Sequence, residues 1–223
     1  MLRAAAALAF VLAATADLTA LALHGEWRIA TKPPLMVLLA LFVALAPAGL
    51  RAMQRWVIGA LIASSAGDAL LLGSSDAAFV AGTLCFALAH VGYIAAFAVP
   101  PGRGLVRRRP WWIAPYALAW LAATLVLAPH LGVLAAVVVP YGALATAMAL
   151  AALNLFGRVP PLAAGLAAGG ALLFVSSDTN LALGRFVPAL APPHVDLLVM
   201  ATYLLAQAGI VAGTTLAARL PQA

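Results

Sequence analysis

Charged residues are scarce in this chain. Of its 223 residues only 8% are Asp, Glu, Lys or Arg, whereas 66% are hydrophobic, and the mean hydropathy is +1.10. A water-soluble domain of this length needs far more charge to cover its surface. Apolar runs recur from end to end, each long enough to cross a hydrocarbon core about 30 Å thick. The composition therefore excludes a soluble protein and predicts a membrane protein.

Cysteine and the familiar catalytic patterns are scarce too. The one cysteine, Cys85, lies within an apolar run, so the chain has no intrachain disulfide framework. The sequence contains no G-x-S-x-G elbow, no H-E-x-x-H helix and no P-loop. Among the histidines only His90 falls within an apolar run. These absences argue against the usual serine, zinc and nucleotide hydrolases, and we expect no metal and no cofactor.

The first residues resemble a secretory signal peptide. Arg3 precedes an Ala/Leu run that reaches Ala14-Thr15-Ala16, a small-residue pattern typical of a cleavage site. The apolar run continues past this pattern to Leu23. We therefore interpret it as a first transmembrane helix that is retained.

Proline and glycine mark the ends of the apolar runs, because both interrupt helices. The pattern predicts an all-α fold, a polytopic transmembrane bundle of eight helices that forms a single domain over residues 1–223. The expected spans are 3–23, 33–50, 56–73, 77–99, 111–128, 132–154, 160–184 and 195–216. We expect a break between Arg51 and Arg55, and a kink at Pro140 within the sixth span.

Eight spans divide the basic residues unequally between the two sides. The side that holds both chain ends carries Arg3, Arg51, Arg55, Arg103, Arg107, Arg108, Arg109, Arg158 and Arg219. The other side carries Arg28, Lys32 and Arg185. Basic residues favour the cytoplasmic side, so we predict that both termini are cytoplasmic in a bacterial inner membrane. The net charge of +6 then orients the protein and does not indicate nucleic acid binding.

Two pairs of residues share one spacing. Asp178 follows Asp68, and Tyr203 follows Tyr93, by 110 residues in each case (178 − 68 and 203 − 93). An offset of four spans returns the chain to the same side of the membrane. A parallel 4+4 repeat is therefore one interpretation, and coincidence is the other.

Ionisable groups within the spans are few. Such a group costs at least about 2.5–3.5 kcal/mol near the centre of a transmembrane helix, so it usually marks function. The candidates are Asp17, Asp68, His90 and Asp178. At a rise of about 1.5 Å per residue, one slab in the non-cytoplasmic half holds polar groups from five helices: Asp68, His90, Tyr141, Asp178 and Tyr203. We expect them to line one cavity, in which two carboxyl groups perform general acid–base chemistry.

Each candidate also has a structural interpretation. Asp178 and Arg185 share a helical face, so an ion pair between them would fix the helix end. Asp68 would pair across helices with Lys32, with hydrogen bonds from the serines of the preceding turn. Asp17 would face water or pair with Lys32. The intramembrane histidine and tyrosines would then be interhelical packing residues.

Short motifs along nearly the whole chain carry a family resemblance. They are Thr31-Lys32-Pro33, Gly67-Asp68-Ala69-Leu70-Leu71, Ala89-His90-Val91-Gly92-Tyr93 at the end of a phenylalanine-rich run from Phe79, Pro140-Tyr141, Phe174-Val175-Ser176-Ser177-Asp178 with Asn180-Leu181-Ala182, and Tyr203-Leu204-Leu205-Ala206-Gln207. In this order they resemble the YhhN-like lysoplasmalogenase family of membrane proteins.

The resemblance implies a hydrolase of lipid metabolism that cleaves the vinyl ether bond of a lysoplasmalogen. The products would be a fatty aldehyde and glycerophosphoethanolamine or glycerophosphocholine. A vinyl ether hydrolyses by proton transfer to its outer carbon, and water captures the resulting oxocarbenium ion. The reaction needs an acid and a second carboxylate, as in glycosidases, and no metal.

The resemblance also implies site residues and partners. We expect Asp68, Asp178 and His90 to be catalytic, without assigning which aspartate is the acid. We expect seven residues to bind the substrate: Lys32, Tyr93, Tyr141, Asn180, Arg185, Tyr203 and Gln207. Lys32 with Arg185 or Arg28 would hold the phosphate. The partners would be a lysophospholipid and membrane lipid.

Two other functions fit the same residues. In a transporter or channel, the aspartates and the histidine would relay protons or cations. In an assembly or scaffold protein, the polar groups would hold the helices together without a connected cavity. A cavity that reaches the aspartates would favour an enzyme or a transporter over a scaffold.

Overall fold

The computed structural model describes residues 1–23, 27–47 and 49–218. Within them the fold is all α-helical and contains no β-strand. Two of the α-helices are single turns, α2 (Arg28–Thr31) and α6 (Leu105–Arg108). The predicted loop at His24 to Glu26 and the predicted cytoplasmic Arg219 lie outside the described residues.

Eight long helices account for most of the described chain. They are α1 (Leu2–Ala22), α3 (Pro34–Ala44), α4 (Arg51–Leu70), α5 (Asp76–Ala98), α7 (Ile113–Leu131), α8 (Ala135–Leu153), α9 (Pro161–Phe186) and α10 (Val195–Ala217). Short 3-10 turns join them at Pro110–Trp112, Gly132–Leu134 and Pro188–Leu190. The predicted all-α helical membrane bundle with eight helices is confirmed.

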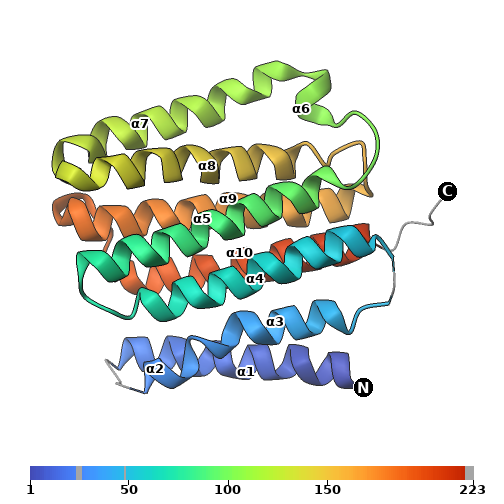
Figure 1. The fold of residues 1–223 in the computed structure, drawn as a ribbon, viewed down its shortest axis with the longest axis horizontal. Helices are drawn as coiled ribbons and strands as arrows, with labels where there is room; N and C mark the ends of the chain where they lie inside the picture. Colours follow the sequence, from blue (N-terminus) through green and yellow to red (C-terminus); the bar gives the residue numbers. More distant parts are fainter. Residues whose placement is uncertain (24–26, 48, 219–223) are drawn as a thin grey trace.

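Five helical stretches among the described residues are long and apolar enough to cross a membrane. They are α1, α5, the run Pro110–Leu153, α9 and α10. The run Pro110–Leu153 contains two antiparallel helices, α7 and α8 (Figure 1). The chain is therefore a multi-pass membrane protein, while the eight individual spans stay a prediction.

Two predicted boundaries around α3 and α4 are wrong. α3 ends at Ala44 and not at residue 50, because Pro47 follows and a proline disfavours helical geometry in the residue before it. The break expected between Arg51 and Arg55 is absent, since α4 begins at Arg51 and includes both arginines. Both side chains are exposed, so the first turns of α4 carry them without burying charge.

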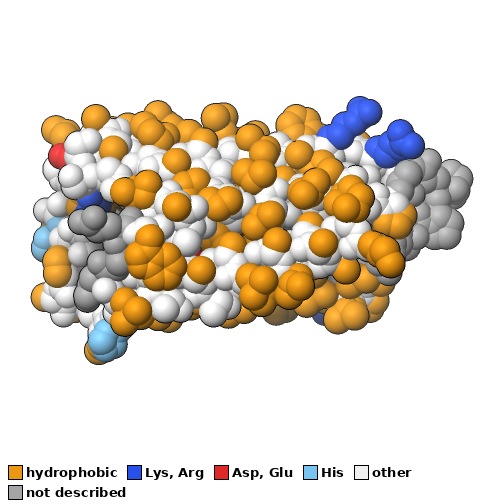
Figure 2. All heavy atoms as spheres, turned by 90° about the horizontal axis from the view of Figure 1, so that it is seen from below, with side chains coloured by type: hydrophobic (Ala, Val, Ile, Leu, Met, Phe, Trp, Pro, Cys, Tyr) orange, Lys and Arg blue, Asp and Glu red, His pale blue; other side chains and the backbone are white. Residues whose placement is uncertain are grey.

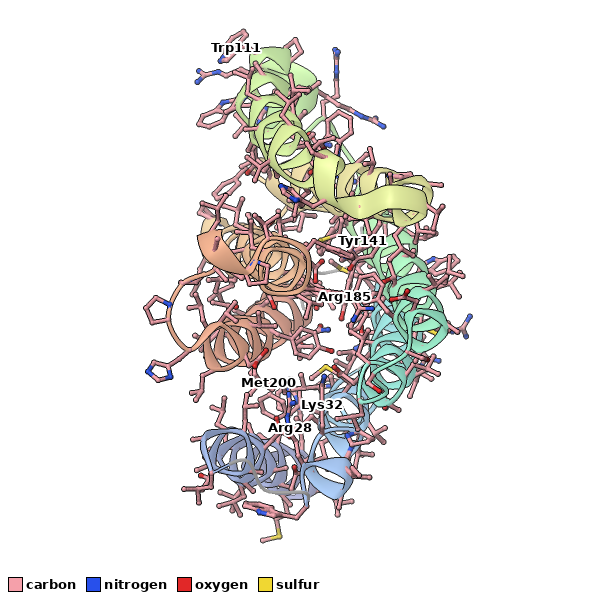
Figure 3. The ribbon with its side chains drawn as sticks, turned by 90° about the vertical axis from the view of Figure 1, so that its left-hand side faces the viewer. Arg28, Lys32, Trp111, Tyr141, Arg185 and Met200 are labelled. Atoms are coloured by element: carbon pink, nitrogen blue, oxygen red, sulfur yellow. The ribbon has the colours of Figure 1, made fainter. Side chains whose placement is uncertain are left out.

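The helices run side by side along the long axis, and α1 begins at the end of the bundle where α10 finishes (Figure 1). Neighbouring contacts close a ring in the order α1, α3, α4, α5, α8, α9 and α10, and α10 returns to α1. Helix α7 lies outside this ring, against α8 and α9. Figure 3 views the ring end-on, with α9 and α10 on one side and α4 and α5 on the other.

The outer surface of the bundle is apolar. The face in Figure 2 carries hydrophobic side chains along its whole length, with charged and histidine side chains toward the two ends. Large exposed hydrophobic residues occur on several helices, such as Leu12 of α1, Leu88 of α5 and Leu125 of α7. Such a surface is stable against lipid and not against water.

Arg158 closes the end of α5. Its guanidinium donates hydrogen bonds of 2.9 Å to the carbonyls of Phe97 and Ala98, and a further bond to the carbonyl of Pro100. Partial burial lowers the pKa of Arg158, and the charge of Arg107 lowers it further. The contact holds the loop between α8 and α9 against the last turn of α5, where helix carbonyls have no partner of their own.

Small residues allow α9 and α10 to pack closely. A Cβ atom added at Gly170 would lie 2.6 Å from the carbonyl oxygen of Ala206 and 2.7 Å from the backbone nitrogen of Ile210. A Cβ atom at Gly213 would lie 2.6 Å from the backbone of Ala163 and Ala167. Close backbone approach at small residues is a usual means of association between transmembrane helices. This packing sets the position of Tyr203 and Gln207 on α10.

We predict that Gly170→Val destabilises the protein by about 1–3 kcal/mol, because the added atoms overpack a contact made of backbone. Gly169→Val is the matched control, since nothing lies within 4 Å of a Cβ atom at Gly169. Thermal unfolding in detergent measures both. Equal unfolding temperatures for the two variants would contradict the close packing of α9 on α10.

Candidate active site

Asp68 of α4 is buried within the bundle, with 2% of its surface exposed. Tyr203 of α10 donates a hydrogen bond of 2.7 Å to Oδ2 of this carboxylate, and Nζ of Lys32 lies 3.4 Å from its Oδ1. Lys32 is buried as well, so protein encloses the ion pair. The interhelical partner predicted for Asp68 is therefore present. Removing one partner of such a buried pair is costly, because the other charge is left alone.

The break between α2 and α3 directs Lys32 inward. Lys32 lies between the two helices, and Pro34 begins α3, where its missing N–H costs nothing. Ser65 of α4 donates a hydrogen bond of 2.7 Å to the carbonyl of Pro33, which ties the break to α4. The serines predicted to bond Asp68 thus have other partners, Ser65 this carbonyl and Ser64 the amide of Gln207.

Tyr93 and Gln207 form a second buried contact, one helical turn from Tyr203 along α10. Tyr93 of α5 donates a hydrogen bond of 2.5 Å to Oε1 of Gln207, and Nε2 of Gln207 donates one of 3.2 Å to Ser64. All three side chains are fully buried. The contact joins α4, α5 and α10 in the interior of the ring.

Asp178 of α9 has different partners. Tyr141 of α8 donates a hydrogen bond of 2.8 Å to its Oδ2, and Nε2 of His90 lies 3.4 Å from the same oxygen. Nε2 of His90 also lies 3.1 Å from the hydroxyl of Tyr141. The imidazole is fully buried, whereas 18% of the Asp178 side chain is exposed. Side chains from α5, α8 and α9 thus meet at one carboxylate.

The proton positions at this group follow from its contacts. Tyr141 uses its only hydroxyl hydrogen in the hydrogen bond to Asp178. A neutral His90 therefore fits when its Nε2–H donates a hydrogen bond to the Tyr141 oxygen. Nδ1 of His90 then carries a lone pair, and it has no hydrogen-bond partner among the described residues. The imidazole, the Tyr141 hydroxyl and the Asp178 carboxyl group thus form one continuous series of hydrogen bonds.

Two phenylalanines lie between the two carboxylate groups. The ring of Phe174 packs edge-on against Tyr203 at 5.4 Å and against His90 at 4.8 Å between centroids. The ring of Phe86 packs against Tyr203 at 5.9 Å and against Phe174 at 6.1 Å. Sequence reasoning gave these residues no role, although both lie in its motifs. They separate Asp68 from Asp178 with apolar rings.

Hollows in the structure reach Asp178. An apolar pocket of about 260 Å³ between α7, α8 and α9 is lined by Trp120, Leu127, Tyr141, Leu172, Asp178 and other residues. A narrow hollow of about 30 Å³ also has Asp178 in its wall, together with Thr83 and Phe86 of α5. Asp68, His90 and Tyr203 line neither of them, and Tyr203 and Lys32 cover Asp68. The prediction that the five polar groups line one cavity is therefore wrong, since only Tyr141 and Asp178 do so.

Arg185 does not pair with Asp178, so that structural prediction is wrong. Nη2 of Arg185 lies 2.5 Å from Oδ1 of Asp76, and its guanidinium lies 4.4 Å from the centroid of Phe79. Arg185 follows Asp178 by seven residues, about 10 Å of helix, and its guanidinium reaches the start of α5 instead. Figure 3 shows Arg185, Lys32 and Tyr141 in the space between the two sides of the ring.

Arg185 and Asn180 line a polar hollow of about 310 Å³ near the start of α10, together with Asp196. The amide of Asn180 donates a hydrogen bond of 2.8 Å to the carbonyl of Ser176 in its own helix. Both residues were predicted to bind substrate, and they share one hollow.

Asp17 is buried, and both predicted arrangements for it are wrong. Thr31 donates a hydrogen bond of 2.9 Å to its Oδ1, and Nε of Arg28 lies 3.7 Å from the same oxygen. Lys32 pairs with Asp68 instead, and the partners of Asp17 are the two α2 residues. Among the described residues, no cluster of three or more His, Cys, Asp or Glu side chains could hold a metal ion.

We predict that Lys32→Met destabilises the protein by roughly 3–5 kcal/mol, because Asp68 loses its buried cation. Arg185→Met is the control, since its partner Asp76 is 74% exposed and such surface pairs contribute about 0–1 kcal/mol. Thermal unfolding in detergent compares the two. The double variant Lys32→Met/Asp68→Asn should recover much of the loss, and a double variant no more stable than Lys32→Met would refute the ion pair.

The chain matches a protein-family model and several known proteins. The model of the YhhN family matches residues 27–214. Lysoplasmalogenase TMEM86B of Sus scrofa is 40% identical over 151 residues, which are 67% of this chain and 58% of that protein. Lysoplasmalogenase TMEM86A of Homo sapiens is 37% identical over 153 residues, 66% of this chain and 60% of that protein.

A bacterial relative matches over a longer stretch. The lysoplasmalogenase of Mycobacterium tuberculosis is 34% identical over 178 residues, which are 76% of this chain and 65% of that protein. The chain thus spans less than two thirds of the length of each of these three relatives. No solved structure matches it significantly. The extent of the family match shows that the chain belongs to the YhhN family.

Proposed function

We propose that this protein is a lysoplasmalogenase that hydrolyses the vinyl ether bond of a lysoplasmalogen. The products are a fatty aldehyde and glycerophosphoethanolamine or glycerophosphocholine. One observation carries the proposal beyond the names of the relatives. Asp178, hydrogen-bonded by Tyr141 and next to His90, lies in the wall of an apolar pocket. An apolar lipid chain and a proton-transfer group can therefore meet there.

The reaction requires two proton movements at one site. An acid first delivers a proton to the outer carbon of the R–CH=CH–O–R′ group, which leaves an oxocarbenium ion. Water then adds to the carbon next to oxygen and loses a proton to a base. The resulting hemiacetal separates into the aldehyde and the glycerol hydroxyl. The sum is one vinyl ether plus one water, so no oxidant or reductant is needed.

Asp178 is the group that we assign to direct proton transfer. It is the aspartate that lines the hollows, and its contact with His90 provides a neighbour that can hold or supply the proton. Tyr141 orients the carboxyl group. General acid–base catalysis of this kind contributes typically about 10²–10⁴-fold to a rate.

We assign Asp68 to stabilisation of the positive charge that develops on the substrate. Its carboxylate is fixed by Tyr203 and Lys32, and Phe86 and Phe174 exclude water between it and the second group. Lys32 offsets part of the carboxylate's charge, so the oriented ion pair acts on the substrate, and an apolar medium screens it less than water does. Tyr93 and Gln207 lie farther inside, and we propose that they position α5 and α10.

Arg185 and Asn180 are our candidates for the phosphate of the head group. Lys32 is engaged with Asp68 and Arg28 with Asp17, both within the protein. Arg185 pairs with an exposed carboxylate that a phosphate can replace, and charge-assisted bonds from arginine suit phosphate.

The transporter alternative draws no support from the relatives, which are named as lysoplasmalogenases. A scaffold would need no hollow beside its polar groups, and Asp178 lines two. The enzyme is the better account of both observations.

We predict that Asp178→Asn lowers turnover by at least about 10²-fold, because the amide neither donates nor accepts the proton of the reaction. Asp68→Asn should lower it as strongly, through loss of the second carboxylate. The assay is release of fatty aldehyde from a lysoplasmalogen by purified protein in detergent, scaled to the amount of folded protein.

Asp17→Asn is the matched control for that assay. Asp17 of α1 is a buried, paired aspartate like Asp68, but its partners are Thr31 and Arg28 of α2 and not the tyrosine and lysine that hold Asp68. We expect lower stability and ordinary turnover per folded molecule. Full activity of Asp178→Asn would remove this residue from the chemistry, and full activity of Asp68→Asn would leave it a structural role.

We also infer that both termini face the cytoplasm of a bacterial inner membrane. The end of the bundle where α1 begins and α10 finishes carries most of the basic residues, among them Arg3, Arg103 and Arg158.

A reporter fused to the C-terminus should read cytoplasmic, and one inserted at Gly132, between α7 and α8, should read the opposite side. The same side for both reporters would contradict the eight-span arrangement, and an inverted result would contradict the orientation.

A further inference from the structure

Three hollows adjoin one another in a line past Asp178. The polar hollow at Arg185 shares Leu71, Phe79 and Leu181 with the narrow hollow beside Thr83. The narrow hollow shares four residues with the apolar pocket, namely Val138, Tyr141, Asp178 and Ala182. Through these shared residues the guanidinium of Arg185 comes first, the carboxylate of Asp178 second and the apolar pocket third.

The apolar pocket is elongated and partly open to the outside of the bundle. Its wall on α7 extends from Tyr116 to Leu131, about 22 Å at the rise of an α-helix. It lies beside the region where α7 diverges from α8 toward α6 (Figure 1). Several α7 residues that line it are exposed or half-buried, such as Ala119 and Ala123. A chain can enter it sideways from the membrane.

The groups along the line match the parts of one kind of molecule. Asp178 is the single formally charged residue in the wall of the apolar pocket, and its other polar groups are hydroxyls and an indole that apolar chains tolerate. The polar hollow holds Arg185, whose partner Asp76 is exposed, together with Asn180 and the carboxylate of Asp196. An anionic group therefore fits at Arg185, and an amine on the same head group fits at the carboxylates.

We propose that these hollows bind one single-chain phospholipid, with its phosphate at Arg185, its ether linkage at Asp178 and its chain along α7. This assignment rests on the proposed function and adds where the substrate lies. It also explains selection of a lysolipid. The narrow hollow of about 30 Å³ shares wall residues with both larger spaces, and a second acyl chain on the glycerol would have no place beside the first there.

The far end of the apolar pocket then sets the chain length. Tyr116, Ala119 and Leu172 line the pocket toward the ends of α7 and α9 that lie away from Arg185. A long chain reaches these residues, whereas a short chain ends before them. A bulky side chain at this end should therefore discriminate against long chains.

A photolabel tests the site without any turnover. The probe is a saturated alkyl ether lysophosphocholine with a diazirine near the end of its chain, which the reaction cannot cleave. We expect adducts on the α7 and α8 walls of the pocket, between Ala119 and Thr124 and between Gly142 and Thr146. Adducts on the apolar groove of α1, α3 and α10, around Phe10 and Phe42, would overturn the assignment, as would labelling spread over the whole lipid-facing surface.

A pair of substitutions tests the chain pocket by activity. Ala119→Trp should lower kcat/KM for a hexadecenyl substrate by at least about 10-fold, and leave an octenyl substrate within about 3-fold. Ala122→Trp is the control, because it is the same change on the same helix at an exposed residue that does not line the pocket. Equal effects of the two variants, or equal losses for both chain lengths, would overturn the proposal.

These two experiments separate the site from the reaction. Labelling of the α7 and α8 walls by a protein that releases no aldehyde would disprove the proposed function and retain the lysolipid site. Aldehyde release by a protein labelled elsewhere would retain the function and disprove the site.

Discussion

A carboxylate in the hydrocarbon interior needs polar partners. The separate sets of partners around Asp68 and around Asp178 organise this bundle. Asp68 joins α4 to the start of α3 through Lys32 and to α10 through Tyr203. Asp178 joins α9 to α8 through Tyr141 and to α5 through His90. The helices of the ring other than α1 therefore meet at one carboxylate or the other. Because each charge would be costly alone, these contacts fix which helix faces meet inside the ring.

The two carboxylates resemble each other in one partner and differ in the second. Each accepts a hydrogen bond from a tyrosine, but Asp68 faces the amine of Lys32 within protein, whereas Asp178 faces an imidazole at the edge of a pocket. That difference suits a division of labour between a fixed charge and a group that exchanges protons. The predicted 4+4 repeat stays a prediction, and the contacts do not follow its symmetry. A repeat that relates Tyr93 to Tyr203 would bring Tyr93 to Asp178, where Tyr141 lies instead.

The sequence was sufficient to predict the helices and to single out the polar side chains that meet inside the ring, because hydropathy and the scarcity of intramembrane charge depend on composition alone. It was not sufficient to predict most pairings. Arg185 reaches Asp76 and not Asp178, and Asp17 takes Thr31 and Arg28, because helix rotation and offset decide these contacts. That geometry depends on features such as the glycine contact between α9 and α10, which periodicity does not reveal. The pocket beside α7 was also not predicted, because a gap between apolar helices is lined by the same residue types as a closed contact.

The account reduces to one chemical claim: a carboxyl group at the edge of an apolar pocket protonates the outer carbon of a vinyl ether. Hydrolysis of a lysoplasmalogen by the purified protein in D₂O tests it most directly, with mass spectrometry of the aldehyde trapped as it forms. The account predicts one deuterium on the carbon next to the aldehyde group, and the oxygen of the ether retained in the glycerol product. An aldehyde without that deuterium, or a glycerol oxygen derived from water, would contradict it.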